Sequence, residues 1–421
     1  MNKALRKFFR DSSTLFQEVG RLPKFAQGLS ICTALVSLVA VCGFISFSTE
    51  LIYYVLLAVN FLYLISAGGA KFNKAFLFLF AVIAINVVVV DIPYFFRPQQ
   101  RGILFGLMTL TASSVLESEL AIRFRRRLFK YVMLGLVVLS VGSFFCFFMG
   151  VNMMSRRVEG MGDFSAYSSH GGWFGGLTVH SMMLGPISMV VALFFYVLYT
   201  ERRRRAYLVL FFMAAMSAVF ASSRAALLGV AVAVAYSLIF GKFSAWMRRR
   251  MLGLLLVCAL FTLPIADVAF RGVLNKHENR AMQNDGNLNS RQDKFDYRIA
   301  EFKKSPLLGV GFCAVDIQVG DAYSPYDGRI EPGTSHLSVL SMTGLLGLLA
   351  YLAILWQAYR NARRSGTPHS RLSLLCFVGM FVHAWFEGYV LSAGGFLAFL
   401  YWLILGQCID SRPQSAKLKK A

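Results

Sequence analysis

Arginine residues at the predicted outer ends of hydrophobic segments are the first candidates for chemistry in this chain. Arg224 lies in the tight turn Ala221–Ala226 between two such segments, and Arg291 opens an amphipathic stretch that also contains Arg298. A guanidinium group matches phosphate oxygens with two parallel hydrogen bonds, so these arginines could bind a phosphorylated, lipid-linked substrate. Two simpler interpretations stay open: an interfacial arginine can reach the lipid headgroups, and the arginines of a surface helix can be solvated.

Histidine and acidic residues near the same predicted face form a second group of candidates. His336 begins a hydrophobic segment. A lone histidine at a membrane interface is usually structural, but an imidazole with a pKa of about 6.5 also suits a general base. His383 and Glu387 are four residues apart, so in one helix they would share a face and could bond each other. Asp91, at the outer end of one hydrophobic segment, and His180, within another segment, are weaker candidates.

The placement of these groups favours chemistry at the membrane surface. Ion-coupled carriers hold their charged groups near the middle of the membrane, whereas the candidates here lie near segment ends. The sequence has no Asp-x-Asp, no His-x-x-x-His and no carboxylate cluster with ligand spacing. We therefore expect no metal and no cofactor, and an anionic, lipid-linked substrate that is reached from outside.

The composition indicates which elements position these residues. Hydrophobic residues make up 57% of the 421 residues and charged residues 15%, whereas a soluble domain has roughly 25% charged residues. The chain is therefore predicted to be an all-α polytopic membrane protein rather than a soluble enzyme or a disordered chain. Of the seven cysteines only Cys313 lies in a polar segment, which excludes a disulfide between loops.

Twelve hydrophobic segments are long enough to cross about 30 Å of hydrocarbon. They cover roughly residues 28–48, 50–68, 74–91, 102–120, 129–152, 177–199, 206–222, 224–241, 251–270, 336–357, 372–390 and 392–410. The net charge of +22 is concentrated in short basic clusters at alternate connections, as the positive-inside rule requires. This pattern predicts two cytoplasmic termini, contact with membrane lipids and no nucleic-acid partner.

The predicted topology divides the chain into three parts. Residues 1–270 form a bundle of nine transmembrane helices, residues 271–335 form one long outer loop, and residues 336–421 form the last three helices and a basic tail. Within the loop, residues 291–304 are expected to form an amphipathic helix, because Phe295, Ile299 and Phe302 recur with helical spacing.

Three stretches, in this order, resemble motifs of the O-antigen ligase and O-antigen polymerase superfamily. Phe220–Gly229 resembles its Ser-Arg-Gly/Ala turn between two spans. Ser290-Arg291, the following helix and Ser305-Pro-Leu-Leu-Gly-Val-Gly311 resemble its arginine, helix and Pro-Leu-x-Gly-x-Gly run. His336 leading into Thr343-Gly-Leu-Leu-Gly-Leu-Leu349 resembles its histidine helix at the exit of the loop, although Thr343 follows the histidine more closely here. The resemblance covers mainly residues 177–405.

The resemblance implies a GT-C-like glycosyltransferase of the bacterial inner membrane with a periplasmic active site. The donor would be a glycan on undecaprenyl diphosphate, and the acceptor of a ligase would be a sugar hydroxyl of lipid A–core. Arg224 and Arg291 would bind the diphosphate, with Arg298 as a possible helper, and His336 would be the base of an inverting displacement. The remaining substrate-binding candidates are His383, Glu387, Asp91 and His180.

Two alternative functions remain open at this stage. A polymerase, of O-antigen or exopolysaccharide, would use another lipid-linked repeat unit as its acceptor; the single long outer loop favours the ligase. A lipid or glycan transporter would need charged groups along a path through the bundle. Glu117, Glu119 and Asp267 are the charged residues nearest to such a path, and all three are expected near segment ends.

Overall fold

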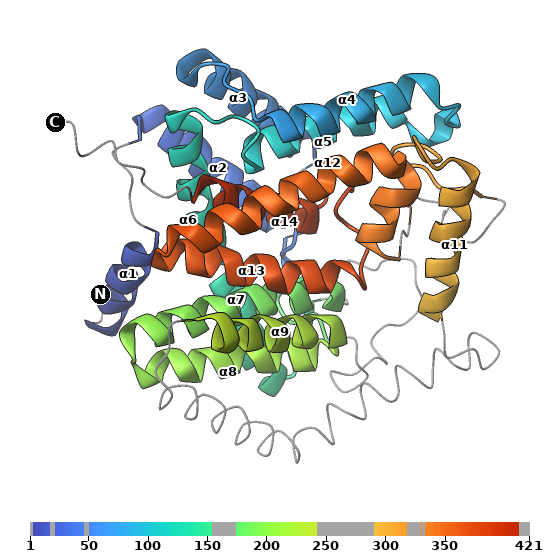
Figure 1. Ribbon diagram of the computed structural model, residues 1–421. Coiled ribbons are helices and arrows are strands. Elements are labelled where there is room, and N and C mark those ends of the chain that lie inside the picture. Colours follow the sequence, from blue (N-terminus) through green and yellow to red (C-terminus); the bar gives the residue numbers. More distant parts are fainter. Residues whose placement is uncertain are drawn as a thin grey trace.

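The computed structural model describes residues 3–16, 22–45, 50–153, 174–241, 290–317, 330 and 333–411. Their regular structure consists of thirteen α-helices and one short 3-10 helix (Figure 1). In chain order these are α1 (Lys3–Leu15), α2 (Lys24–Val39), α3 (Glu50–Gly68), α4 (Lys74–Val89), η1 (Tyr94–Phe96), α5 (Pro98–Ala112), α6 (Glu119–Phe148), α7 (Ser181–Arg202), α8 (Arg205–Phe220), α9 (Arg224–Phe240), α11 (Ser290–Lys304), α12 (Ser335–Ser365), α13 (Pro368–Ala384) and α14 (Phe396–Asp410). The all-α class is confirmed.

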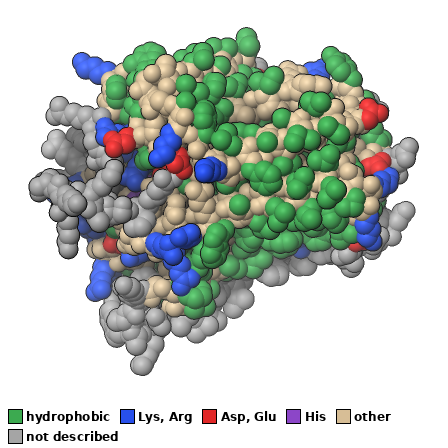
Figure 2. Space-filling model, turned by 45° about the horizontal axis from the view of Figure 1, so that its top comes forward, with side chains coloured by type: hydrophobic (Ala, Val, Ile, Leu, Met, Phe, Trp, Pro, Cys, Tyr) green, Lys and Arg blue, Asp and Glu red, His purple; other side chains and the backbone are tan. Residues whose placement is uncertain are grey.

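The helices have the length and composition of membrane-embedded elements. Among the described residues, α3, α6, α7 and α12 are long and apolar enough to cross a membrane, and α2, α4, α8, α9 and α14 are shorter apolar helices. Figure 2 shows hydrophobic side chains over a broad central band of one face, with Lys and Arg side chains gathered toward one end. Each predicted segment overlaps a helix, except 251–270, which lies outside the described residues.

Several predicted boundaries are wrong, and polar residues explain one of them. The fourth predicted segment, 102–120, ends in the structure at Ala112, and α6 begins at Glu119 instead of 129. The Ser118 side chain accepts a hydrogen bond from the backbone N–H of Ala121 and caps α6. The eleventh segment, 372–390, is helical only to Ala384, and α14 begins at Phe396.

Ion pairs gather at one end of the molecule, which we call the inner end. There the Asp11 carboxylate of α1 pairs with Arg204 and accepts a hydrogen bond from Tyr207. Arg125 of α6 forms a two-pronged ion pair with Asp410 at the end of α14, with distances of 2.8 and 2.9 Å. Both ends of the described chain lie on this side (Figure 1). Segments predicted to be cytoplasmic therefore lie together, although helix α1 itself was not expected.

The opposite end, which we call the outer end, holds the first residues of α9 and α12. Here α12 is broken, because Gly344 has a left-handed φ of 65° with ψ of −166°. A Cβ at this position would overlap the carbonyl oxygen of Leu307, so only glycine fits. The predicted segment 336–357 is thus two helical pieces, Ser335–Thr343 and Leu345–Ser365.

The loop after α11 supplies hydrogen bonds to the backbone groups that this break leaves open. Val310 N–H donates to the Ser341 carbonyl at 2.8 Å, and Leu345 N–H donates to the Pro306 carbonyl at 2.8 Å. Unpaired backbone groups are costly in an apolar environment, so loop 305–311 and the break stabilise each other. This explains in physical terms why the glycine-rich motif and the broken helix occur together.

The buried Asn86 of α4 completes this arrangement. Its amide NH₂ donates to the carbonyls of Leu308 and Met342, and its Oδ1 accepts from the backbone N–H of Phe312. One side chain therefore bonds both the loop and the broken helix. We call Asn86, residues 305–312 and residues 341–345 the helix-break clamp.

Candidate active site

Four elements present their ends at the outer end of the molecule. These are the start of α9, the end of α13, the start of α12, and helix α11, which stands beside α12 at the edge of the bundle (Figure 1). Helices α9 and α13 approach closely at two glycines, because a Cβ on Gly229 would lie 2.9 Å from the carbonyl oxygen of Gly379. The first turn of α9 is therefore level with the last turn of α13.

Arg224 is the first residue of α9 and is exposed. The preceding turn is short, and Ser222 adopts a left-handed φ of 52° that allows the chain to reverse direction. The Arg224 side chain makes no ion pair or hydrogen bond with the described residues. Its guanidinium is thus held at the outer end with its donors available for an anionic ligand.

Helix α11 carries the two other arginine candidates, which differ in their surroundings. Arg291 occupies the second position of α11, and its side chain lies outside the described part of the structure. Arg298 is 2% exposed and donates to Glu301 at 2.7 Å and to Ser341 of α12 at 3.4 Å. Burial lowers the pKa of Arg298, and the Glu301 carboxylate opposes that shift. Arg298 therefore anchors α11 to α12.

The most deeply buried side chains of α11 with described surroundings are charged rather than apolar. Ile299 is 39% exposed, whereas Arg298 and Glu301 are each 2% exposed. The Glu301 carboxylate also accepts a hydrogen bond from the backbone N–H of Asp316. The amphipathic helix is present over the predicted residues, but it packs on α12 through a charged pair and directs Ile299 outward.

His336 lies in the first turn of α12 and is 7% exposed. Its Nε2 lies 3.0 Å from the Phe381 carbonyl, an acceptor, so Nε2 carries the proton in the neutral ring. Its Nδ1 faces the Tyr351 hydroxyl at 3.3 Å, and that hydroxyl is 2.5 Å from the Tyr401 hydroxyl. Nδ1 is thus the nitrogen with a lone pair. Its contact with the Tyr351 hydroxyl is longer than the contact of Nε2 with the Phe381 carbonyl.

The expectation that His383 and Glu387 share a helical face is wrong, because α13 ends at Ala384. The buried His383 lies instead with its Nδ1 3.3 Å from the Tyr389 hydroxyl. Glu387 lies in the connection to α14, and its backbone carbonyl accepts a hydrogen bond from Ser335. His383 therefore lies in the last turn of α13 beside Tyr389, whereas Glu387 lies beyond the end of that helix.

The two weaker candidates lie at helix ends. His180 precedes α7 and caps it, because its Nδ1 accepts a hydrogen bond from the backbone N–H of Met182 at 3.0 Å. It is therefore a capping residue before the helix, not a residue within it as the segment 177–199 implied. Asp91 is exposed and lies just beyond the end of α4.

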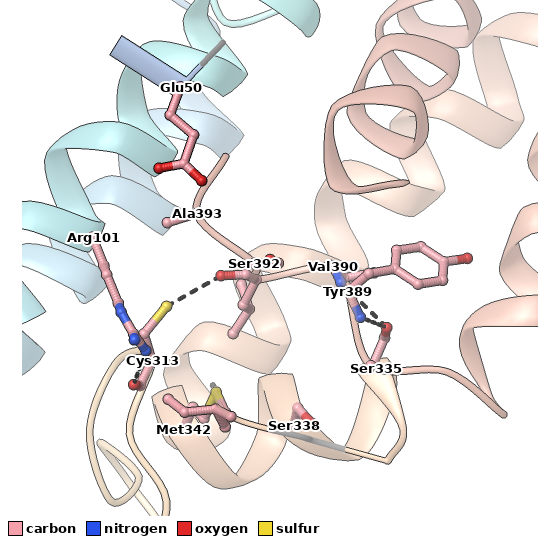
Figure 3. A pocket seen from close by; sticks show the side chains of 13 residues that line it. Glu50, Arg101, Cys313, Ser335, Ser338, Met342, Tyr389, Val390, Ser392 and Ala393 are labelled. Atoms are coloured by element: carbon pink, nitrogen blue, oxygen red, sulfur yellow. Dashed lines mark hydrogen bonds between the residues drawn. The ribbon is translucent and has the colours of Figure 1, made fainter. Parts of the chain in front are cut away.

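A pocket of about 530 Å³ opens at the outer end beside Ser335 (Figure 3). Its polar lining includes Glu50, Arg101, Ser335, Ser338, Tyr389 and Ser392. Sequence reasoning did not single out any of these residues. Glu50 and Arg101 resemble ordinary interfacial charges in the sequence, and only the packing of α3, α5 and α12 brings them to one cavity.

Cysteine and metal chemistry find no support in the described residues. Cys313 lines the pocket, but burial raises the pKa of its thiol to about 12, so the thiol stays neutral. Within the described ranges, no three His, Cys, Asp or Glu side chains lie together as a metal site would require.

Comparison with known protein families identifies the segment that contains these groups. Residues 209–355 match the O-antigen ligase family model. The matched range runs from α8 into α12 and includes Arg224, Arg291, Arg298, His336 and the loop 305–311. No curated protein matches the chain. The family expected from the three motifs is thus confirmed for this segment.

Proposed function

We propose that the O-antigen ligase family segment at residues 209–355 makes this protein a lipid-linked glycan transferase, and specifically an O-antigen ligase. The donor is a glycan on undecaprenyl diphosphate, and the acceptor is a sugar hydroxyl of lipid A–core. The protein lies in the bacterial inner membrane with its active site facing the periplasm. The observation that carries this proposal is the family match, which includes the exposed Arg224 at the outer end.

The proposed reaction is a direct displacement at the anomeric carbon of the donor. The acceptor oxygen forms a bond to that carbon, and the bond between carbon and diphosphate oxygen breaks with its electron pair on the leaving diphosphate. Preorganised cations stabilise the charge that develops there. Arg224 and Arg291 are assigned to this role, while Arg298 is assigned to holding α11, because its charge is already paired with Glu301.

The proton of the acceptor hydroxyl is assigned to His336. Because the Phe381 carbonyl fixes the proton on Nε2, the accepting atom is Nδ1. The acceptor must then replace the Tyr351 hydroxyl at Nδ1, and that hydroxyl can donate to Tyr401 instead. Contacts of this length in a protein without substrate commonly rearrange on binding.

The test is a reconstituted transfer with purified protein, undecaprenyl-diphosphate glycan and lipid A–core, without nucleotide or metal. A single addition of glycan to lipid A–core is the expected product. A ladder of longer lipid-linked glycans, formed without lipid A–core, would instead establish a polymerase. If neither product forms, the transferase proposal fails for these acceptors, and transfer to another acceptor or a transport function takes its place.

A further inference from the structure

Two aromatic rings at the end of α13 lie against His336. Phe381 and Trp385 are four residues apart there, so they share one face of the helix. The distance between ring centroids is 4.5 Å from His336 to Phe381 and 4.8 Å from His336 to Trp385. The Phe381 carbonyl also accepts from His336 Nε2 at 3.0 Å. The end of α13 therefore holds the imidazole that is assigned to take the acceptor proton.

Trp385 differs from the imidazole beneath it in its exposure. Its side chain is among the exposed large hydrophobic ones, at 41%, whereas His336 is 7% exposed. Trp385 caps the end of α13 with a helical backbone (φ −68°, ψ −26°), and its backbone N–H donates to the Val382 carbonyl at 3.2 Å. The helix thus fixes the position of the indole, which packs on His336 and keeps part of its surface accessible.

The indole N–H of Trp385 makes no hydrogen bond with any residue that the structure describes. The buried Trp402 is different, because its Nε1 donates to the Val390 carbonyl at 2.9 Å. A buried indole usually finds such a partner, whereas an indole at a wet surface can donate to a ligand. Trp385 therefore offers an accessible aromatic ring and one available donor beside the proposed base.

An aromatic face with an adjoining donor is complementary to a sugar ring. The face of an aromatic ring carries partial negative charge, so it attracts the polarised C–H groups on one side of a pyranose. The hydroxyls at the rim of the pyranose can accept from the indole N–H. An anion is disfavoured on this face for the same electrostatic reason, and an acyl chain would leave the N–H without a partner. These features favour a neutral sugar.

A second exposed tryptophan provides a comparison within the same chain. Trp356 of α12 is 64% exposed and packs on Tyr359, with 6.2 Å between ring centroids. Tryptophans are common at membrane surfaces, where an indole bridges the wet and apolar regions. Trp356 fits that ordinary role, whereas Trp385 lies against a candidate catalytic residue. Trp356 is therefore the matched control for Trp385.

We propose that Trp385 is the platform on which a sugar ring of the acceptor stacks, beside the hydroxyl that gives its proton to His336. The inference rests on the proposed glycan transfer and names a residue that binds the acceptor. The acceptor is favoured over the donor, because Trp385 contacts the residue assigned to the acceptor proton. The donor diphosphate is assigned to Arg224 and Arg291 instead.

Steady-state kinetics in the reconstituted transfer test this role. Trp385→Leu keeps apolar bulk but removes the ring, so the acceptor KM should rise roughly tenfold, with the donor KM unchanged and kcat within about threefold. Trp385→Tyr retains a ring and should recover most of the loss, and Trp356→Leu should leave both KM values unchanged. A donor KM that rises alone would overturn the proposal. A fall in kcat with an unchanged acceptor KM would also overturn it, because Trp385 would then only hold His336 in place.

A binding measurement tests the platform without any transfer reaction. The purified full chain, in a detergent without sugar headgroups, is titrated with the core oligosaccharide released from lipid A–core and followed by tryptophan fluorescence. We expect a saturable change in the wild type and in Trp356→Phe, and loss of most of that change in Trp385→Phe. No saturable change in the wild type, or the same change in Trp385→Phe, would overturn the proposal.

The two measurements separate failure of the platform from failure of the function. A fluorescence change that depends on Trp385, without transfer in the wild type, would retain the sugar platform and reject the transferase. Transfer in the wild type, with an unchanged acceptor KM in Trp385→Leu and an unchanged fluorescence response in Trp385→Phe, would retain the transferase and reject the platform.

Discussion

The guanidinium of Arg224 is exposed at the outer end of α9, where a short turn fixes its backbone. Replacing Arg224 or Arg291 with alanine removes a charge assigned to the leaving diphosphate, so we expect kcat to fall roughly 10²–10³-fold. The reconstituted transfer assay measures this loss, with membrane expression checked in parallel. Arg123→Ala, which removes a half-buried arginine at the inner end, should retain full activity. Activity of either variant close to that of this control would remove the residue from the mechanism.

His336 and Tyr351 can be separated by substitution, because only the histidine is assigned to take a proton. His336→Ala should lower kcat roughly 10²–10⁴-fold, as expected for loss of a general base. Tyr351→Phe removes the hydroxyl that faces Nδ1 and should lower kcat only a few-fold, since the acceptor must displace that hydroxyl. Single-turnover rates with bound donor measure both effects. A near-wild-type rate for His336→Ala, or equal losses in the two variants, would contradict the assignment.

At the scale of elements, the helix-break clamp joins α4, the loop after α11 and both pieces of α12. Asn86→Leu leaves the carbonyls of Leu308 and Met342 and the N–H of Phe312 without this partner, so we expect a loss of about 2–5 kcal/mol in stability. The buried Asn60→Leu is the matched control, because Asn60 donates only to Thr33 and its loss should cost about 1 kcal/mol. Thermal unfolding in detergent, followed by tryptophan fluorescence, measures both. Equal losses would show that the clamp contributes no more than one hydrogen bond.

The sequence predicted the elements of the bundle better than their interruptions. Hydropathy detects apolar segments, but it cannot detect the break at Gly344, because both pieces of α12 are apolar and the break depends on contact with residues 305–311. The end of α13 was missed for a similar reason, since Trp385 and Phe386 are as apolar as the helix before them. In α11 the apolar period was read correctly, yet the buried face is set by the Arg298–Glu301 pair. The ion pair between Arg298 and Glu301 therefore determines which face of α11 is buried, and the spacing of its apolar residues does not.

Candidate site residues could be predicted only where a motif marked them. Arg224 and His336 lie in stretches with recognisable patterns, and both lie at the outer end as expected. Glu50, Arg101 and Asn86 are single polar residues whose partners are far away in the sequence. No local pattern identifies such residues, because tertiary packing alone gives them their role.

At the scale of the whole molecule, the two ends differ in chemistry and define an expected orientation. The inner end holds the basic connections, and the outer end holds Arg224 and the pocket beside Ser335, so from the positive-inside rule we expect the pocket to face the periplasm. Cysteines introduced one at a time report this orientation with a membrane-impermeant maleimide on spheroplasts. Ser392→Cys in the pocket loop should react directly, and Ser365→Cys at the end of α12 should react only after permeabilisation. The parent chain, with its seven cysteines, sets the background. The reverse labelling would place the arginines and the pocket in the cytoplasm, and the proposed periplasmic transfer to lipid A–core would then be wrong.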